Sequence, residues 1–296
     1  MSTLPPRPGG KDEGDPGSES RPFRGSAAEG RGRDGGGHDS GHDGDAVVRI
    51  AARAGRLMLE SGSETNRVQD TVNALCLSLG MVEAESFATP TGLMLTAVNR
   101  QGRAFTMVTR ITSRAVDLEK VSRTFRLART IGPDAMDSHA VAWELDRIEG
   151  TPHYPMVVKV LAGGLAAACC SLLFGGGYRE ALASLPVGAL VKLLSILLAK
   201  VRTNEFLINV VGGTLAAMLA FSAAAAGLTG RPDRVIVGSI MLLIPGLTMV
   251  SAIRDTIAGD LVAGISRAVE ALIVAAAIAI GTGLGIRLWM LLFGGL

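Results

Sequence analysis

A break in a long apolar run is the first place where this chain has residues that could do chemistry. Pro245 and Gly246 interrupt the apolar run 235–253. Three charged residues follow at once: Arg254, Asp255 and Asp260. A helix in a bilayer that contains Pro-Gly gives up backbone hydrogen bonds, and such breaks normally occur where the freed groups line a polar path. The pattern therefore indicates a pathway for a polar solute.

Other charged and amide side chains lie in or beside the apolar runs. Lys192 lies midway along the run 181–199, and Arg267 and Glu270 of the last run are spaced to pair on one helix face. The third run begins with a polar group: Asn204, Glu205 and Asn209. Inserting one charged side chain at the centre of a bilayer costs about 2.5–3.5 kcal/mol of free energy on insertion scales. Charged residues in these runs are therefore candidates for a functional role. The predicted pathway residues are Lys192, Asn204, Asn209, Pro245, Gly246, Arg254, Asp255, Asp260 and Glu270.

Each of these charges also has a purely structural explanation. Lys192 could extend its ammonium group to the membrane surface or pair with an acid on a neighbouring helix. Arg267 and Glu270 could simply neutralise each other. Asp255 and Asp260 could cap the amino end of the last helix, where carboxylates are favoured. The residues alone leave both readings open.

The elements that must position these side chains are apolar runs that follow residue 150. Each is near the roughly 20 residues needed to cross about 30 Å of hydrocarbon. The runs are 156–175, 181–199, 206–228, 235–253 and 262–293. They predict an α-helical integral membrane protein whose domain 151–296 has five transmembrane helices. Glycines in these runs allow close contact between helices.

Residues 46–150 predict a small α+β domain. Helical periodicity from Asp45 stops at Ser61-Gly62, and Ser63 is expected to cap a second helix that ends near Gly80. Three short β-like runs follow, and then two helices. The expected ranges are 82–88, 92–98 and 104–111 for the strands, and 117–131 and 138–148 for the helices.

Residues 1–45 are rich in Gly, Ser, Asp, Arg and Pro. Such a segment buries too little apolar surface to offset its chain entropy, so we predict a disordered tail. The tail has no apolar stretch like that of a signal peptide. We therefore expect the domain 46–150 in the cytosol and the apolar runs as a multi-pass membrane domain in contact with lipid.

Composition argues against several other functions. The chain has 29 Lys+Arg and 27 Asp+Glu, a net charge of +2, and only 2 Trp and 2 Tyr, which argues against a nucleic-acid partner. Its 3 Cys have no zinc or disulfide spacing, so no metal and no cofactor is predicted. The domain 46–150 has a single histidine and no nucleophile-elbow or Walker sequence, so no catalytic residue and no enzyme is predicted.

Several segments resemble the signature segments of the threonine/serine exporter family. They are residues 57–68, 87–92, 245–246, 253–255 and 259–260, and the resemblance covers about 46–290. It implies a secondary exporter in the bacterial plasma membrane that uses an ion gradient to move small hydrophilic metabolites out of the cell. We expect the matched residues of the first domain to contact the membrane domain and to help gate it. They are Glu60, Gly62, Glu64, Thr65, Thr89, Pro90, Thr91 and Gly92.

The resemblance also implies a partner. Single-chain members have two hydrophobic halves with about ten helices in all. With five predicted helices, this chain resembles the longer member of the two-gene version, in which a second membrane subunit supplies the other half of the pathway. A homo-oligomer is the alternative. In the two-gene version the implied cargo is succinate rather than threonine.

The predicted function is therefore a subunit of a secondary active exporter. Its small-molecule substrate would be threonine/serine or a dicarboxylate such as succinate, held by Lys192 or Arg254. Proton drive is expected because a carboxylate in a low-dielectric site can have its pKa raised toward neutrality, and Asp255, Asp260 or Glu270 could carry the proton. Two alternatives are a membrane-anchored enzyme and a regulatory or assembly subunit of another transporter.

Overall fold

The computed structural model describes residues 39–113, 115–131, 138–151, 154–201 and 203–294. Residues 1–38 of the predicted disordered tail lie outside the described residues. The first helix, α1 (Asp39–Glu60), begins at Asp39 rather than at Asp45, inside the segment that we predicted to be disordered.

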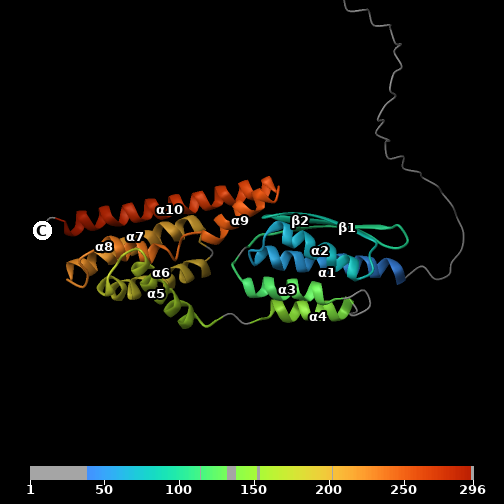
Figure 1. Cartoon of the computed structure of the whole chain (residues 1–296), viewed down its shortest axis with the longest axis horizontal. Coiled ribbons are helices and arrows are strands. Elements are labelled where there is room, and N and C mark those ends of the chain that lie inside the picture. Colours follow the sequence, from blue (N-terminus) through green and yellow to red (C-terminus); the bar gives the residue numbers. More distant parts are fainter. Residues whose placement is uncertain (1–38, 114, 132–137, 152–153, 202, 295–296) are drawn as a thin grey trace, which may run out of the picture. The chain divides into compact units, whose positions relative to one another are not determined.

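The first domain joins a helical pair to a small sheet. Helix α2 (Thr65–Ser78) follows α1, and both pack on the strands β1 (Glu83–Thr89), β2 (Gly92–Val98) and β3 (Ala104–Arg110). The sheet is antiparallel in the order β1-β2-β3 (Figure 1). Alternate residues of β2 face the helices, so Leu93, Leu95 and Ala97 are buried. The predicted small sheet is confirmed.

Helices α3 (Leu118–Thr130) and α4 (Ser138–Glu149) complete this domain by packing on each other and on α1. Arg53 of α1 forms ion pairs with Asp146 and Glu149 of α4, both at 2.5 Å. The Arg53 guanidinium holds the pKa of the Glu149 carboxyl below its usual value. Burial raises the pKa of the Cys76 thiol to about 12, which makes it an inert core side chain.

The remaining helices form an apolar bundle. Among the described residues, four helices are long and apolar enough to cross a membrane: α5 (Met156–Leu173), α6 (Tyr178–Lys200), α7 (Glu205–Ala225) and α10 (Leu261–Phe293). The run 235–253 is not one continuous helix, and the break at Pro245-Gly246 that the sequence indicated is confirmed. The run is divided between α8 (Pro232–Ile240) and α9 (Gly246–Ile257), which Figure 1 shows as separate helices. Four of the five predicted spans are therefore continuous helices among the described residues, and the fifth crossing stays a prediction.

Glycines allow the helices of the bundle to pack closely. A side chain at Gly213 of α7 would bring its Cβ 2.9 Å from the Ile278 carbonyl of α10. On the other side of the bundle, a Cβ at Gly164 of α5 would lie 2.6 Å from the Leu185 carbonyl of α6. Only glycine fits these positions without a shift of the backbone, as expected for close transmembrane packing.

Candidate functional site

The break between α8 and α9 has a simple chemical origin. Pro245 has no N–H, so it cannot donate to the Met241 carbonyl one helical turn earlier. The amide of Gly246 donates to the Ile244 carbonyl at 2.8 Å. The Leu242 carbonyl therefore also lacks its usual helical donor, which would have been this amide. Pro245 then stands at the amino end of α9. The break therefore makes α9 a separate helix, and one side of that helix is polar.

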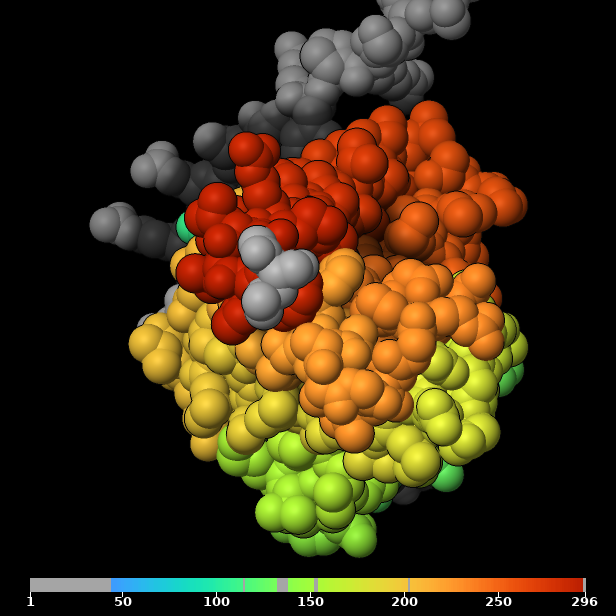
Figure 2. All heavy atoms as spheres, turned by 90° about the vertical axis from the view of Figure 1, so that its left-hand side faces the viewer, coloured from blue at the N-terminus to red at the C-terminus, as the bar shows by residue number. Residues whose placement is uncertain are grey.

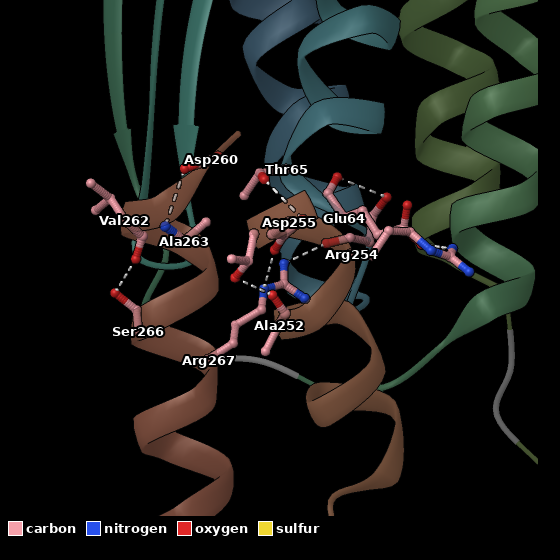
Figure 3. Close-up of polar contacts among 12 residues, drawn as sticks. Glu64, Thr65, Ala252, Arg254, Asp255, Asp260, Val262, Ala263, Ser266 and Arg267 are labelled. Carbon is pink, nitrogen blue, oxygen red and sulfur yellow. Dashed lines mark hydrogen bonds and ion pairs between the residues drawn. The ribbon is translucent and has the colours of Figure 1, made fainter. Parts of the chain in front are cut away.

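That polar face of α9 contacts the first domain (Figure 3). Arg254 donates to the carboxylate of Glu64, and the two form an ion pair at the surface. One residue further on in each segment, the Thr65 hydroxyl donates to Asp255 Oδ1 at 3.2 Å. Thr65 is the first residue of α2, so the carboxylate lies at the amino end of that helix, where negative charge is favoured.

Arg267 of α10 completes this contact. Its Nη2 donates to the Ser63 carbonyl at 2.7 Å, and its Nε lies 3.1 Å from Asp255 Oδ2. Asp255 and Arg267 are 1% and 7% exposed, so the ion pair is buried. The Nε–H does not point at the oxygen, and Asp255 Oδ2 has no hydrogen-bond donor among the described residues. We call Ser63, Thr65, Asp255 and Arg267 the polar latch.

A cavity of about 220 Å³ adjoins the polar latch. Its charged lining consists of Glu205 at the start of α7, together with Arg267 and Glu270 of α10. The first domain and α9 supply the rest of the wall: Leu59, Gly62, Pro90, Ala115, Val116, Leu247, Thr248 and Ser251. Segments far apart in the sequence thus enclose one small space that carries both signs of charge.

Local backbone chemistry shapes the wall from the first domain. Gly62 has φ +85°, a conformation that side chains disfavour, and it ends α1 so that Ser63 can turn toward Arg267. In the β1–β2 hairpin, Thr89 pairs with Gly92, and its hydroxyl donates to the Gly92 carbonyl at 3.3 Å. This tight connection presents Pro90 to the cavity.

Other residues predicted for gating lie beside the cavity without lining it. Thr91 is exposed at the hairpin tip, and its hydroxyl is 3.4 Å from that of Thr89. The Glu60 carboxylate lies 3.9 Å from Arg56 one turn earlier on α1. Ser63 does not cap α2 as we predicted. Glu64 stands at the cap position without a capping side-chain bond, and the Ser63 hydroxyl donates to the Glu64 carbonyl at 3.5 Å.

The structure separates several predicted pathway residues from the cavity. The Asp260 carboxylate accepts from the Ala263 amide at 3.1 Å and caps α10. This is the capping role that we gave as the structural alternative for Asp260. Asn204 caps α7 by accepting from the Phe206 amide, and buried Asn209 donates to the Glu205 carbonyl. Of the predicted pathway set, Glu270 lines the cavity directly. The cavity wall begins at Leu247, immediately after Pro245 and Gly246.

Lys192 lies on α6 away from this cavity. Its stem packs on α5, where a Cβ at Gly163 would come within 2.8 Å of the Lys192 Cβ. Among the described residues it has no hydrogen bond or ion pair. The structure therefore does not bring Lys192 to the polar latch, although the sequence placed both in one pathway.

Two contributions to the site escaped sequence reasoning. Arg267 was expected to pair with Glu270 on its own helix, but its described partners are Asp255 and the Ser63 carbonyl. Thr248 and Ser251, the polar residues that α9 contributes to the cavity wall, were also missed. Thr248, Ser251 and Asp255 recur at helical spacing on one side of α9, and this periodicity was the available signal.

A family comparison decides the identity of the chain. The model of a family described as "Putative threonine/serine exporter" matches residues 49–289, which include the polar latch and the whole cavity lining. The chain belongs to the threonine/serine exporter family. The family resemblance predicted from the sequence is confirmed, and the chain is a membrane protein of a transporter family.

Relatives of this exporter-family chain fall into two length classes. It is 29% identical to a "Threonine/serine exporter" of Corynebacterium glutamicum over 82% of this chain and 51% of that protein. It is 24% identical to a "Probable threonine/serine exporter" of Mycobacterium tuberculosis over 87% of this chain and 49% of that protein. The chain thus spans about half the length of these two relatives.

The second length class matches along almost its whole length. The chain is 23% identical to a "Probable succinate transporter subunit" of Escherichia coli strain K12 over 82% of this chain and 95% of that protein. No solved structure matches the chain. The comparisons support a membrane exporter, and they name two kinds of cargo among the relatives.

Proposed function

We propose that the chain is a subunit of a secondary active exporter for small amino acids such as threonine and serine, and that the cavity beside the polar latch holds the substrate. The observation that carries the proposal is the pairing of both charge signs in a space of about 220 Å³. Pockets for drug-sized ligands are larger, roughly 300–1,000 Å³. The cavity suits a small polar metabolite.

The charges of the cavity favour an amino acid over a dicarboxylate. Glu205 and Glu270 can attract an ammonium group, and Arg267 can attract a carboxylate. Asp255 already offsets much of the positive charge of Arg267. The described lining thus offers an opposite charge to each end of an amino acid, whereas a dicarboxylate would place one of its carboxylates beside a carboxylate of the wall.

We propose proton coupling through Asp255. Its Oδ2 is buried beside Arg267 and has no hydrogen-bond donor among the described residues, so a proton could occupy that oxygen. Protonation would remove the charge that holds Arg267. Arg267 would then be free to bind the substrate carboxylate or to release the Ser63 carbonyl, which links proton uptake to opening of the latch.

The length of α10 bears on how the chain is placed in the membrane. Its 33 residues extend about 50 Å, whereas the hydrocarbon is about 30 Å thick. Part of the excess belongs at the amino end, where Asp260 caps the helix and Arg267 contacts the first domain. Arg267 and Glu270 then lie near the membrane edge. We propose that this edge faces the cytosol of a bacterial cell, that the membrane is the plasma membrane, and that a second membrane subunit completes the pathway.

The test measures efflux of preloaded threonine, serine and succinate from vesicles that contain the exporter. We expect threonine efflux, and we expect Glu205→Gln and Glu270→Gln each to lower it at least tenfold. The matched control is Glu119→Gln, which removes an exposed carboxylate paired with Arg123 on α3. Efflux of succinate alone, or equal efflux from all three variants, would contradict the proposed substrate site.

A further inference from the structure

The side of α9 and α10 that faces away from the cavity forms an apolar groove of about 390 Å³. Its floor is made of small residues, which include Ala252 of α9 and Ala268, Ala271 and Ala275 of α10. Its rims carry larger apolar side chains that are well exposed, such as Ile253 at 61% and Leu272 at 70%. Thr256 is the one polar residue in the described lining.

The break that precedes α9, one of the two helices of this groove, has lost hydrogen bonds that a bilayer does not replace. Pro245 lacks an N–H, and the Gly246 amide is used by Ile244, so the Met241 and Leu242 carbonyls lack their usual helical donors. Ile244 and Leu247 on either side of the break are 41% and 40% exposed. A Cβ at Gly246 would meet nothing within 4 Å.

The break lies between the two faces of the bundle. Arg234 near the start of α8 donates to the Phe174 carbonyl at the far end of α5, whereas Arg254 near the end of α9 contacts the first domain. Irregular backbone at membrane depth is tolerated only where protein or a water-filled cavity covers it, and not in contact with lipid. Lipid alone is therefore a poor cover for the break that precedes α9.

The groove and the proposed substrate site lie on opposite sides of the same two helices. On α9, cavity residues such as Ser251 alternate with groove residues such as Ala252. On α10, Arg267 and Glu270 line the cavity, and Ala268 and Ala271 line the groove. A helix in the groove would therefore press directly on the two helices that hold the polar latch.

We propose that the groove between α9 and α10 is the docking site for an apolar transmembrane helix of a second membrane subunit. The proposal rests on the proposed function, in which such a subunit completes the pathway. The exporter relatives are about twice as long as the matched region, and the relative of similar length is called a subunit. Small residues at the floor allow the close approach that transmembrane helices use.

The first experiment places a photo-crosslinking amino acid at Leu272, in the full chain expressed in its own membrane. The matched control is the same amino acid at Leu161 of α5, which is 60% exposed. Figure 2 shows α10 (red) and α5 (light green) on opposite edges of the bundle end. We expect the Leu272 site, and not the Leu161 site, to crosslink to an apolar helix of a second membrane polypeptide that is required for efflux when co-expressed.

The second experiment fills the groove. Ala275 lies exposed in the groove, and Ala166 lies exposed on α5. We expect Ala275→Trp to abolish the crosslink and to lower efflux at least tenfold, and Ala166→Trp to change neither. Crosslinks to lipid only, crosslinks to a second copy of this chain, or equal behaviour of the two Trp variants would overturn the docking site.

The two proposals fail in different ways. Efflux of amino acids without a crosslink to a second subunit would refute the docking site and leave the proposed function intact. A Leu272 crosslink to a second subunit that is lost in Ala275→Trp, together with no efflux of any tested metabolite, would refute the proposed function and support the docking site.

Discussion

At the scale of single residues, the site depends on charges that are shared between distant segments. Glu64 stands at the amino-terminal cap position of α2, and Arg254 belongs to α9. Their ion pair lies at the surface, because the side chain of Glu64 is 22% exposed and that of Arg254 is 58% exposed. Exposed pairs contribute little to stability, typically below about 1 kcal/mol. The value of this pair therefore lies in where it holds α9 relative to the first domain.

This position leads to a prediction for charge reversal. Glu64→Arg places two cations together beside the latch, and we expect efflux to fall at least fivefold while the melting temperature changes by only a few degrees. The double variant Glu64→Arg with Arg254→Glu restores opposite charges, and we expect it to recover most of the efflux. Initial efflux rates in vesicles and thermal unfolding in detergent provide the measurements.

The control for this pair is the reversal of another exposed ion pair of the first domain. Glu119→Arg disrupts the pair with Arg123, which is distant in sequence from the latch, and it should leave efflux unchanged. A double variant no more active than Glu64→Arg would show that the specific side chains matter and not their mutual charge.

Sequence reasoning found most of the residues of the site but not their partners. Asp255 and Glu270 were singled out because charged residues are conspicuous in or beside apolar runs, whereas Gly62 and Pro90 were singled out by the family resemblance. The partner of Arg267 could not be read in the same way, because Asp255 and the Ser63 carbonyl approach it only after folding. Glu270 was expected to be the partner of Arg267 because the two residues are three positions apart on one helix, and this spacing is visible in the sequence.

At the scale of elements, the long helices and the sheet follow from local pattern. Strand β2 occupies Gly92–Val98 as its alternating residues predicted. The broken pair α8 and α9 was visible as Pro245-Gly246, but hydropathy alone suggested one continuous span. The start of α1 was missed because a segment rich in Gly, Asp and His does not display an apolar face.

Helix packing provides a prediction at this scale. A Cβ at Gly213 would lie 2.9 Å from the Ile278 carbonyl and 3.0 Å from the Thr282 amide, so α7 and α10 would have to separate. Overpacking typically costs about 1–3 kcal/mol. We expect Gly213→Val to lower the melting temperature in detergent by several degrees and to reduce efflux.

Gly283 of α10 is the matched control, since a Cβ there meets nothing within 4 Å. Gly283→Val has the same change in composition and helix propensity, so we expect it to melt close to the original chain. Equal losses for the two variants would mean that helix propensity, and not the α7–α10 contact, determines stability.

At the scale of the whole molecule, the polar latch connects two parts of unlike chemistry. The first domain has its own apolar core and charged surface, whereas the bundle exposes apolar side chains along its helices. Within the described residues, Ser63 and Thr65 on one side and Asp255 and Arg267 on the other provide buried polar contacts between them. Motion of the first domain is therefore coupled to α9 and α10, which also wall the cavity.

Asp255 is the residue through which this coupling can be tested. Asp255→Asn keeps the shape of the side chain but leaves Arg267 buried without its anion, and breaking a buried pair typically costs about 3–5 kcal/mol. We expect this variant to lose proton-driven efflux. We also expect a lower melting temperature, which by itself would not separate a role in coupling from a role in folding.

A second change separates the two roles. In the double variant Asp255→Asn with Arg267→Gln, no charge is left buried without a partner, so we expect the melting temperature to return toward that of the original chain. Proton-driven efflux should remain absent, because neither the proton-accepting carboxylate nor its cation is present. Efflux that returns together with stability, and still responds to the proton gradient, would show that the latch holds the domains together without carrying the proton.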